Sequence, residues 1–85
     1  MRDYYEELWR ELPDPLRPPD RALRVAFMRA HVRAGERVLD LGCGDGWMCG
    51  ELAALGAVPL GVEIAPAAVQ RARRHHPDLE FRIAE

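Results

Sequence analysis

The sequence predicts an α/β fold in which three parallel strands alternate with helices, and two further helices precede the first strand. Three short apolar runs of strand length lie at residues 37–42, 58–64 and 79–83. Segments of helical periodicity separate these runs, which favours parallel pairing through right-handed crossovers. A glycine-rich turn directly follows the first run. This order is typical of the first half of a doubly wound sheet, a partial domain of the form β-α-β-α-β.

The N-terminal region, residues 1–35, is interpreted as a helical cap with a proline-rich linker. Apolar side chains from Tyr5 to Leu12 recur at helical spacing, which predicts a helix over residues 3–12. The segment LPDPLRPPD, residues 12–20, cannot continue that helix. Its prolines lack backbone donors and bias the preceding residues towards extended conformations, so we expect a stiff linker.

A second helix is expected over residues 21–33, immediately before the first strand. Asp20 precedes it and is suited to cap its first turn. Gly35 suits its C-terminal end, because glycine adopts the left-handed conformation that often ends a helix. The apolar residues expected to share one face of this helix are Leu23, Ala26, Phe27 and Ala30.

The remaining chain, residues 36–85, carries the three strands and the two helices between them. The first of these helices is expected over residues 47–55, and Gly56 ends it. Pro66 suits the first turn of the second helix, which continues over residues 67–75. A turn then leads into the third strand, where apolar and polar residues alternate as in a half-buried strand.

The composition excludes several classes of function. The chain has 85 residues and a net charge of −2, which gives no general attraction to nucleic acid or anionic lipid. It has no lysine, so Walker-type phosphate binding and Schiff-base chemistry are excluded. No apolar run is long enough to span a membrane. Cys43 and Cys49 have no metal-ligand spacing, and two reduced cysteines fit a cytoplasmic protein.

The segment RVLDLGCGDGWMCGEL, residues 37–52, places Gly42, Gly44 and Gly46 where the first strand becomes a helix. Because glycine lacks a Cβ, it tolerates positive φ and lets a bulky ligand lie directly on the backbone. A tight turn needs one glycine, so three within five residues favour a ligand site. The spacing G-x-G-x-G differs from the G-x-G-x-x-G of dinucleotide-binding turns, which leaves NAD as a weaker alternative.

Glu63 lies at the end of the second strand, seventeen residues after Gly46. A carboxylate at this place can accept hydrogen bonds from both hydroxyls of a ribose. Because a hydrogen bond to a charged group contributes about 1.5–3 kcal/mol, Glu63→Ala is expected to weaken ligand binding about ten- to a hundredfold without unfolding the chain.

The segments VLDLGCGDG, LGVEIAP and LEFRIAE together resemble the N-terminal half of a class I S-adenosylmethionine-dependent methyltransferase. The first is similar to that family's motif D/E-x-G-x-G-x-G, and the resemblance covers residues 37–85. It implies a Rossmann-like sheet and S-adenosyl-L-methionine as the cofactor. It also implies methyl transfer to an unidentified acceptor, expected to be a small molecule, with this chain supplying the cofactor-binding half.

The resemblance implies a role for each residue that matches the family's motifs. Asp40 would orient the loop and attract the methionine ammonium group, and Glu63 would hold the ribose hydroxyls. Ile64 would cover one face of the adenine. Glu85 would lie near the adenine amino group, with a frayed terminal charge as the alternative interpretation. The cofactor-binding backbone is assigned to Gly42, Cys43, Gly44 and Gly46. In this family acid–base residues tend to lie after the fourth strand, so no catalytic residue is assigned.

Several other residues keep a structural interpretation beside a functional one. Asp45 is expected to cap the following helix rather than to touch a ligand. The aromatic residues of the first helix, including Trp9, either close over a ligand or form an ordinary amphipathic face. The basic cluster around Arg71 is interpreted as the solvated face of a helix.

Two further functions remain open: a non-catalytic S-adenosylmethionine- or nucleotide-binding module that needs a partner chain, and an inactive truncated product. The family's strand order, 3-2-1-4-5, places the first strand in the middle of the sheet. With the sequence ending at Glu85, that strand has one unpaired edge, so we expect self-association, pairing with another chain, or aggregation.

Overall fold

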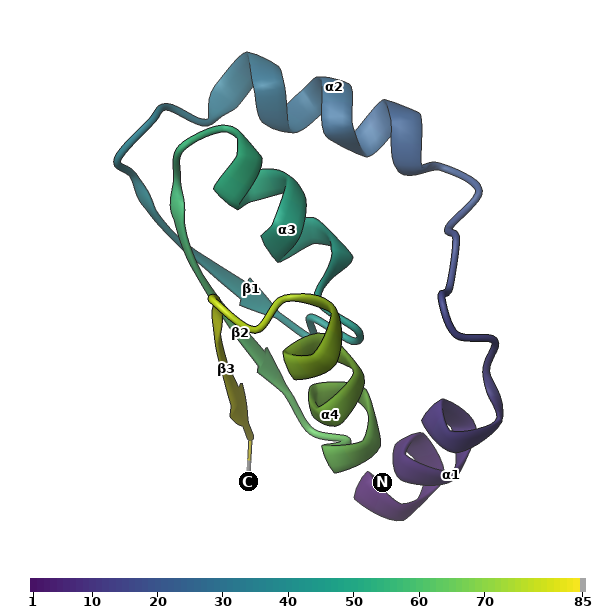
Figure 1. Cartoon of the computed structure of the whole chain (residues 1–85). Helices are drawn as coiled ribbons and strands as arrows, with labels where there is room; N and C mark the ends of the chain where they lie inside the picture. Colours follow the sequence, from purple (N-terminus) through teal and green to yellow (C-terminus); the bar gives the residue numbers. More distant parts are fainter. Residues whose placement is uncertain (85) are drawn as a thin grey trace.

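The computed structural model describes residues 1–84 and arranges them as a three-stranded sheet with helices packed against it (Figure 1). The prediction of an α/β fold with a partial doubly wound sheet is confirmed. Glu85 lies outside the described residues, and so does the adenine contact expected of it. The elements are α1 Arg2–Glu11, α2 Arg21–His31, β1 Arg37–Leu41, α3 Trp47–Ala54, β2 Val58–Glu63, α4 Pro66–His75 and β3 Glu80–Ile83.

All three strands run parallel, in the order β1-β2-β3. Leu39 of β1 lies beside Leu60 of β2 in the register. Because the strands are parallel, their carboxyl ends meet at one edge of the sheet, where the loops that follow β1 and β2 approach each other. The amides of Gly42 and Cys43 both donate to the carbonyl oxygen of Val62, at 2.7 and 3.0 Å, and these bonds fix the glycine loop to the end of β2.

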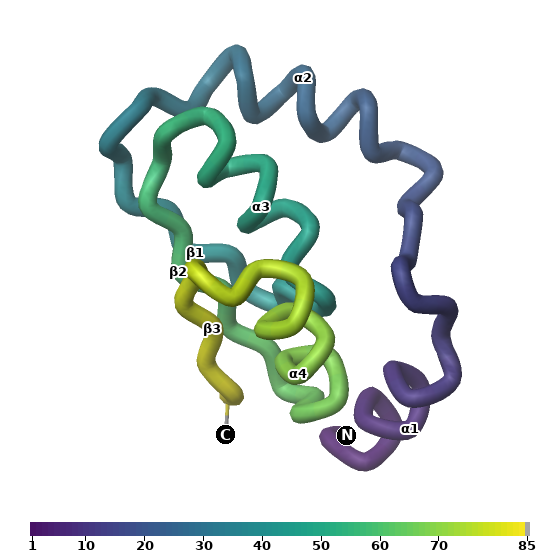
Figure 2. Tube along the Cα trace, viewed as in Figure 1, coloured from purple at the N-terminus to yellow at the C-terminus, as the bar shows by residue number. Residues whose placement is uncertain are grey.

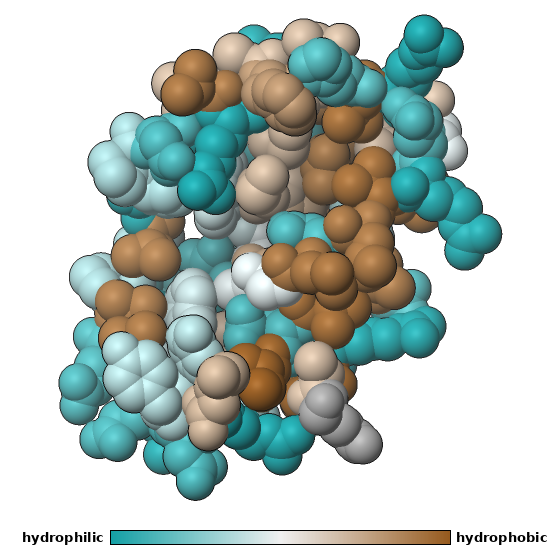
Figure 3. Space-filling model, turned by 180° about the vertical axis from the view of Figure 1, so that it is seen from behind, coloured by the Kyte–Doolittle hydropathy of each residue, from teal (hydrophilic) through white to brown (hydrophobic). Residues whose placement is uncertain are grey.

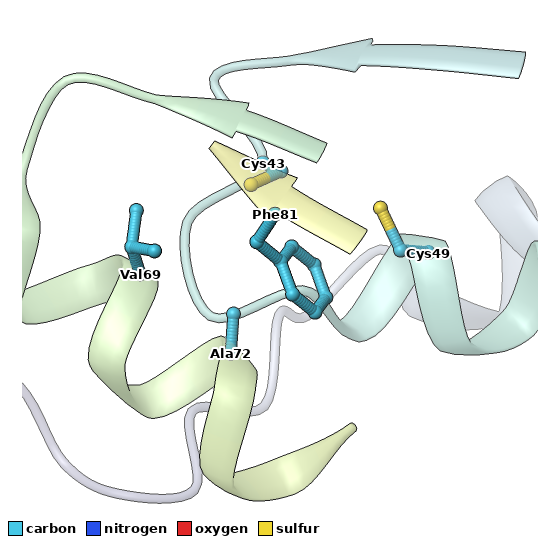
Figure 4. Packing of buried hydrophobic residues seen from close by; sticks show 5 residues of the cluster. All are labelled: Cys43, Cys49, Val69, Ala72 and Phe81. Carbon is cyan, nitrogen blue, oxygen red and sulfur yellow. The ribbon is translucent and has the colours of Figure 1, made fainter. Parts of the chain in front are cut away.

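The main hydrophobic core lies between the sheet and the two helices α3 and α4. Its residues come from the glycine loop, α3, α4 and β3, and they are Cys43, Cys49, Val69, Ala72 and Phe81. Figure 4 shows the Phe81 ring lying among the other four side chains. Burial of a ring of this size stabilises the fold by about 1.5–3 kcal/mol, so Phe81 anchors the short strand β3.

The helix α2 packs on α3 through a different face from the one expected. Leu23 and Phe27 are 75% and 66% exposed, whereas Met28 is buried against Leu52 and Ala57. The expectation was wrong because α2 has apolar residues on more than one side. The spacing of apolar residues predicts such a helix, but the elements that pack against it determine which side is buried.

Asp20 occupies the N-cap position of α2 without capping it. No hydrogen bond from a backbone amide of the first turn reaches its side chain, and its Oδ2 accepts instead from Nε of Arg24 at 2.7 Å. This contact joins residues one helical turn apart, so an exposed ion pair replaces the expected cap. The helix also ends at His31, two residues earlier than predicted, because Val32 already has an extended backbone.

The face of the sheet opposite α3 and α4 carries exposed apolar side chains. Leu39 and Leu41 of β1 are 57% and 73% exposed. Seen from behind, hydrophobic residues gather over part of the molecule (Figure 3). Apolar strands of parallel sheets are normally buried on both faces. Within the described residues, β1 is therefore an edge strand with one apolar face open to solvent.

The N-terminal helix α1 packs beside the first turn of α4, across the linker from α2 (Figure 2). The carboxylate of Glu6 accepts a hydrogen bond from the amide of Ala67 at 2.6 Å. Ala67 lies in the first turn of α4, where backbone donors have no partner within the helix. Glu6 thus caps α4 from another helix. The dipole of α4 favours a negative charge at this N-terminal end. No helix of residues 1–84 is long and apolar enough to cross a bilayer.

Candidate functional site

A cavity of about 470 Å³ lies at the carboxyl ends of β1 and β2, where α1 forms its opposite wall. This is the crevice in which open parallel sheets bind their ligands. One side carries strand-end and loop residues, and the other carries the apolar stripe of α1. The lining residues are Tyr5, Leu8, Trp9, Leu12, Leu41, Gly42, Val62, Glu63, Ile64 and Ala84.

The three glycines of the loop all have left-handed backbones, with φ of +72° at Gly42, +56° at Gly44 and +83° at Gly46. A side chain is strained at such angles, which is the reason that the turn requires glycine. Gly42 lines the cavity, and a Cβ placed on it would meet no atom within 4 Å. At this position the bare backbone is directly open to a ligand.

The other two glycines lie beneath side chains. A Cβ on Gly44 would lie 2.6 Å from Cζ2 of Trp9, and one on Gly46 would lie 2.7 Å from Cζ of Phe81. Gly46 therefore makes room for the core, and Gly44 makes room for α1. The amides of the loop are also engaged, since Gly42 and Cys43 donate to Val62. A ligand therefore meets bare backbone at Gly42.

The Glu63 carboxylate holds the loop together from the end of β2. It is only 6% exposed, its Oε1 accepts from the amide of Gly44 at 3.1 Å, and its Oε2 accepts from the amide of Ala65 at 2.8 Å. Each carboxylate oxygen has two lone pairs, so each keeps an acceptor site after these bonds. Glu63 also lines the cavity. It can therefore bind a hydroxyl group while it supports the glycine loop.

Asp40 lies outside the lining of the cavity. It is half-buried, and its Oδ2 accepts a hydrogen bond from the Cys49 thiol at 3.7 Å. Burial, to which the charge of Glu63 adds, raises the pKa of Asp40 above its usual range, against the opposing influence of Cys49 and Arg24. The Asp40 carboxylate thus contacts α3 and does not line the cavity.

Both cysteines belong to the core. Burial, followed by the negative charge of Asp40, raises the pKa of Cys43 and of Cys49 to about 12. At neutral pH the two thiols are protonated, and protonated thiols are poor nucleophiles and poor metal ligands. No group of three or more His, Cys, Asp or Glu side chains with metal-binding geometry occurs within residues 1–84.

Asp45 behaves as predicted. It is buried, and its Oδ1 accepts a hydrogen bond from the amide of Trp47, the first residue of α3, at 3.3 Å. Trp47 packs partly buried against the cluster that joins α2 to α3, so it belongs to the core rather than to the cavity. Ile64, which directly follows Glu63, does line the cavity.

Arg71 is the residue that sequence reasoning misplaced. It is buried, at 7% exposure, rather than on a solvated face of α4. Its guanidinium donates to the carbonyl oxygens of Leu12 and Pro13, at 2.6 and 2.8 Å, and lies 5.7 Å from the Trp9 ring. The one available signal is that Arg71 stands among the small apolar residues of α4. Its partners lie 58 and 59 positions away, so the local sequence does not reveal them.

The chain is similar to proteins of one family. The family described as "Methyltransferase domain" matches residues 1–84. A ubiquinone biosynthesis O-methyltransferase from Nitrosococcus oceani is 43% identical over 54 residues, which are 62% of this chain and 23% of that protein. A ribosomal protein L11 methyltransferase from Cupriavidus metallidurans is 34% identical over 97 residues, covering 91% of this chain and 32% of that protein.

Solved structures show the same similarity. A protein from a study of the conversion of a disulfide bond into a thioacetal group in echinomycin biosynthesis superimposes with a TM-score of 0.77 at 26% identity, covering 100% of this chain and 40% of that one. A SAM-dependent methyltransferase from Thiobacillus denitrificans, in complex with S-adenosyl-L-homocysteine, gives 0.60 at 29%, covering 84% and 30%. The chain thus spans less than half the length of these proteins.

Proposed function

Because this chain belongs to the S-adenosylmethionine-dependent methyltransferase family, we propose that it binds the family's cofactor at the carboxyl ends of β1 and β2. In this proposal the chain supplies the cofactor-binding half of a methyl-transfer site. The observation that carries it is that Gly42 and Glu63 line one cavity, so that open backbone and a carboxylate face the same space.

The residues of the cavity fit the chemistry of S-adenosylmethionine. A ribose has two adjacent hydroxyl groups, and the Glu63 carboxylate keeps two acceptor sites for them. The adenine ring is flat and largely apolar on its faces, and Ile64 together with the apolar stripe of α1 offers surfaces of that kind. The sulfonium carries a positive charge, which suits a cavity that the Glu63 carboxylate lines.

The remaining predicted residues support the loop in this proposal. Cys43 and Gly46 shape it, through the Val62 carbonyl and through the space that Phe81 fills. Gly44 contributes a surface that Trp9 now covers. Asp40 lies behind the loop, so we assign it an influence on the electrostatic potential rather than a direct contact. In all, the proposed cofactor site has Gly42, Glu63 and Ile64 in its lining. The residues that support it are Asp40, Cys43, Gly44 and Gly46.

S-adenosylmethionine supplies a methyl group that its sulfonium already activates. The chain's own contribution is then to bind and to orient. Glu63 fixes a sugar by its hydroxyl groups, while Gly42 lets the bound molecule lie close to the backbone. The stripe on α1 excludes water from one side of the cavity. Holding a reactive group in a fixed direction is itself a large part of catalysis in a transfer reaction.

The acceptor is proposed to be a small molecule. The relatives include a ubiquinone biosynthesis enzyme and an enzyme named for a ribosomal protein, so both small and large acceptors occur among them. The wall formed by Tyr5, Leu8 and Trp9 is apolar and aromatic and lies across the cavity from the strand ends. The part of this wall that the cofactor leaves free favours a compact acceptor with apolar parts over an extended charged one.

A matched pair of glycine substitutions tests the proposed site. Gly42 and Gly35 both have left-handed backbones, with φ of +72° and +85°, and a Cβ on either would meet no atom within 4 Å. Gly42→Ala and Gly35→Ala therefore carry similar backbone strain, about 1–2 kcal/mol. Only Gly42→Ala adds a methyl group to the cavity. Overpacking of this kind is expected to weaken S-adenosylmethionine binding about five- to 150-fold, measured by calorimetric titration.

The outcomes separate the functional alternatives. The site is supported if Gly42→Ala weakens the binding of S-adenosylmethionine while Gly35→Ala keeps the affinity within about twofold of the wild type. Equal losses in both variants, or none in either, would contradict it. Absence of wild-type binding would contradict the proposal and favour a chain without cofactor binding of its own. A methyl-transfer assay with and without candidate partner chains then distinguishes a catalytic half-site from a non-catalytic binding module.

We also propose that the chain self-associates through β1. Within the described residues β1 pairs with β2 alone, and Leu39 and Leu41 on this strand are largely exposed. An open edge with apolar side chains is a template for pairing with another strand. A second copy of the chain offers the same edge and the same leucines.

A further inference from the structure

The helix α1 forms one wall of the proposed cofactor cavity, yet it has little packing of its own. None of its residues is fully buried, and Tyr4 is largely exposed. Residues 12–20, which form neither helix nor strand, separate it from α2. Burial of apolar surface normally holds a helix against the rest of a fold, but it contributes little to the position of α1. A few polar contacts with α4 must determine where this wall stands.

The strongest of these contacts is made by Arg71. Its two hydrogen bonds reach the carbonyl oxygens of Leu12 and Pro13, immediately after the last residue of α1. Carbonyl groups at the end of a helix have no partner within the helix, and the helix dipole makes that end attractive to a cation. A buried guanidinium that donates to both oxygens fixes the position of the helix end.

The same side chain also orients Trp9. The guanidinium carbon lies 5.7 Å from the centre of the Trp9 ring, within the range of a cation–π contact. The ring system also approaches Gly44, where an added Cβ would lie 2.6 Å from Cζ2 of Trp9. Trp9 is thus held between α4 and the glycine loop, and it lines the cavity there. Displacement of Arg71 would release both the ring and the helix end.

We propose that Arg71 is a positioning residue for the cofactor site: it fixes α1 so that Trp9 stands over the glycine loop, and it thereby slows the release of bound cofactor. This inference rests on the proposed function. Arg71 acts through Trp9, Leu12 and Pro13 and does not line the cavity itself. We call these three contacts the Arg71 latch.

Two fluorescence measurements test the latch. The chain has two tryptophans, so Trp47→Phe leaves Trp9 as the only indole. In this background Arg71→Met keeps an unbranched apolar stem but removes the guanidinium group, with its charge and its donors. Arg29→Met makes the same change at an exposed position of α2 and serves as the control. Quenching by acrylamide reports how accessible Trp9 is, and stopped-flow mixing reports how fast S-adenosylhomocysteine dissociates.

Arg71→Met is expected to raise the quenching constant of Trp9 and to increase the dissociation rate about tenfold, because hydrogen bonds from a charged group are lost. Arg29→Met should leave both within about twofold. Arg71→Lys keeps the charge but lacks the planar fork, so it should rescue part of each effect. Rescue of this kind separates a specific latch from general packing, and it remains measurable if Arg71→Met fails to fold.

Each result decides one point. Unchanged quenching in Arg71→Met, or in Arg71→Lys if only that variant folds, would overturn the latch whether or not a ligand binds. Raised quenching with an unchanged dissociation rate would overturn its role in holding the cofactor. If the wild-type chain does not bind S-adenosylhomocysteine, the proposed function fails and the cofactor role of Arg71 fails with it, while the quenching comparison still tests the contact with Trp9.

Discussion

Removal of the Glu63 carboxylate should destabilise the fold as well as the proposed site. In Glu63→Ala the amides of Gly44 and Ala65 lose their acceptors, at 3.1 and 2.8 Å, and both residues are buried. A buried donor without a partner costs about 1–3 kcal/mol, so the two together cost roughly 2–6 kcal/mol. Domains of this length have a total stability of about 4–13 kcal/mol, so the loss is a large fraction of it.

Urea denaturation followed by circular dichroism measures this loss. Glu51→Ala is the matched control, because Glu51 forms an ion pair with Arg21 at the surface. Exposed pairs of that kind contribute at most about 1 kcal/mol. A Glu63→Ala variant as stable as Glu51→Ala would refute the view that Glu63 supports the loop. The sequence-based expectation that Glu63→Ala leaves the fold intact is replaced here, since it treated Glu63 as a ligand contact only.

Two further predictions concern the first strand. The pKa of Asp40 is raised by burial, so the folded chain favours the neutral form, and the stabilising contribution of Asp40 is lost as pH rises from about 4 through the raised pKa. Asp40→Asn should therefore flatten the pH dependence of the melting temperature above pH 4, and an unchanged profile would show that this carboxyl does not govern it. Leu39→Lys replaces an exposed side chain on the open edge strand and should shift sedimentation towards the monomer at micromolar concentration, with Leu23→Lys on α2 as the control. Equal shifts in the two variants would contradict pairing through β1.

Much of the fold was predictable because its signals are local. The three strands and four helices follow from periods of two and of 3.6 in the apolar residues, and from glycine and proline at the ends of elements. Asp45 and the left-handed glycines are local features as well, since each depends on the backbone of the same turn. In these cases all the interacting groups lie close together in the sequence.

The errors concern interactions between distant segments. Nothing near Arg71 indicates that carbonyl oxygens 58 and 59 positions earlier would receive its guanidinium. Similarly, Trp9 and Phe81, which cover Gly44 and Gly46, lie on other elements, so the glycine spacing alone does not reveal these contacts. The buried face of α2 depends on where Leu52 and Ala57 stand. A single sequence gives the identity of each residue but does not indicate which distant residues will be in contact.

A titration of the ¹⁵N-labelled chain with S-adenosylhomocysteine, followed by backbone amide chemical shifts, tests the proposed site most directly. Binding in the cavity between the strand ends and α1 predicts the largest shifts at Gly42, Glu63 and Ile64, with smaller ones at Trp9. The amides of α2, around Phe27, should not move. Shifts centred on α2, or none at all at saturating ligand, would contradict the assignment of the cofactor to the loop after β1.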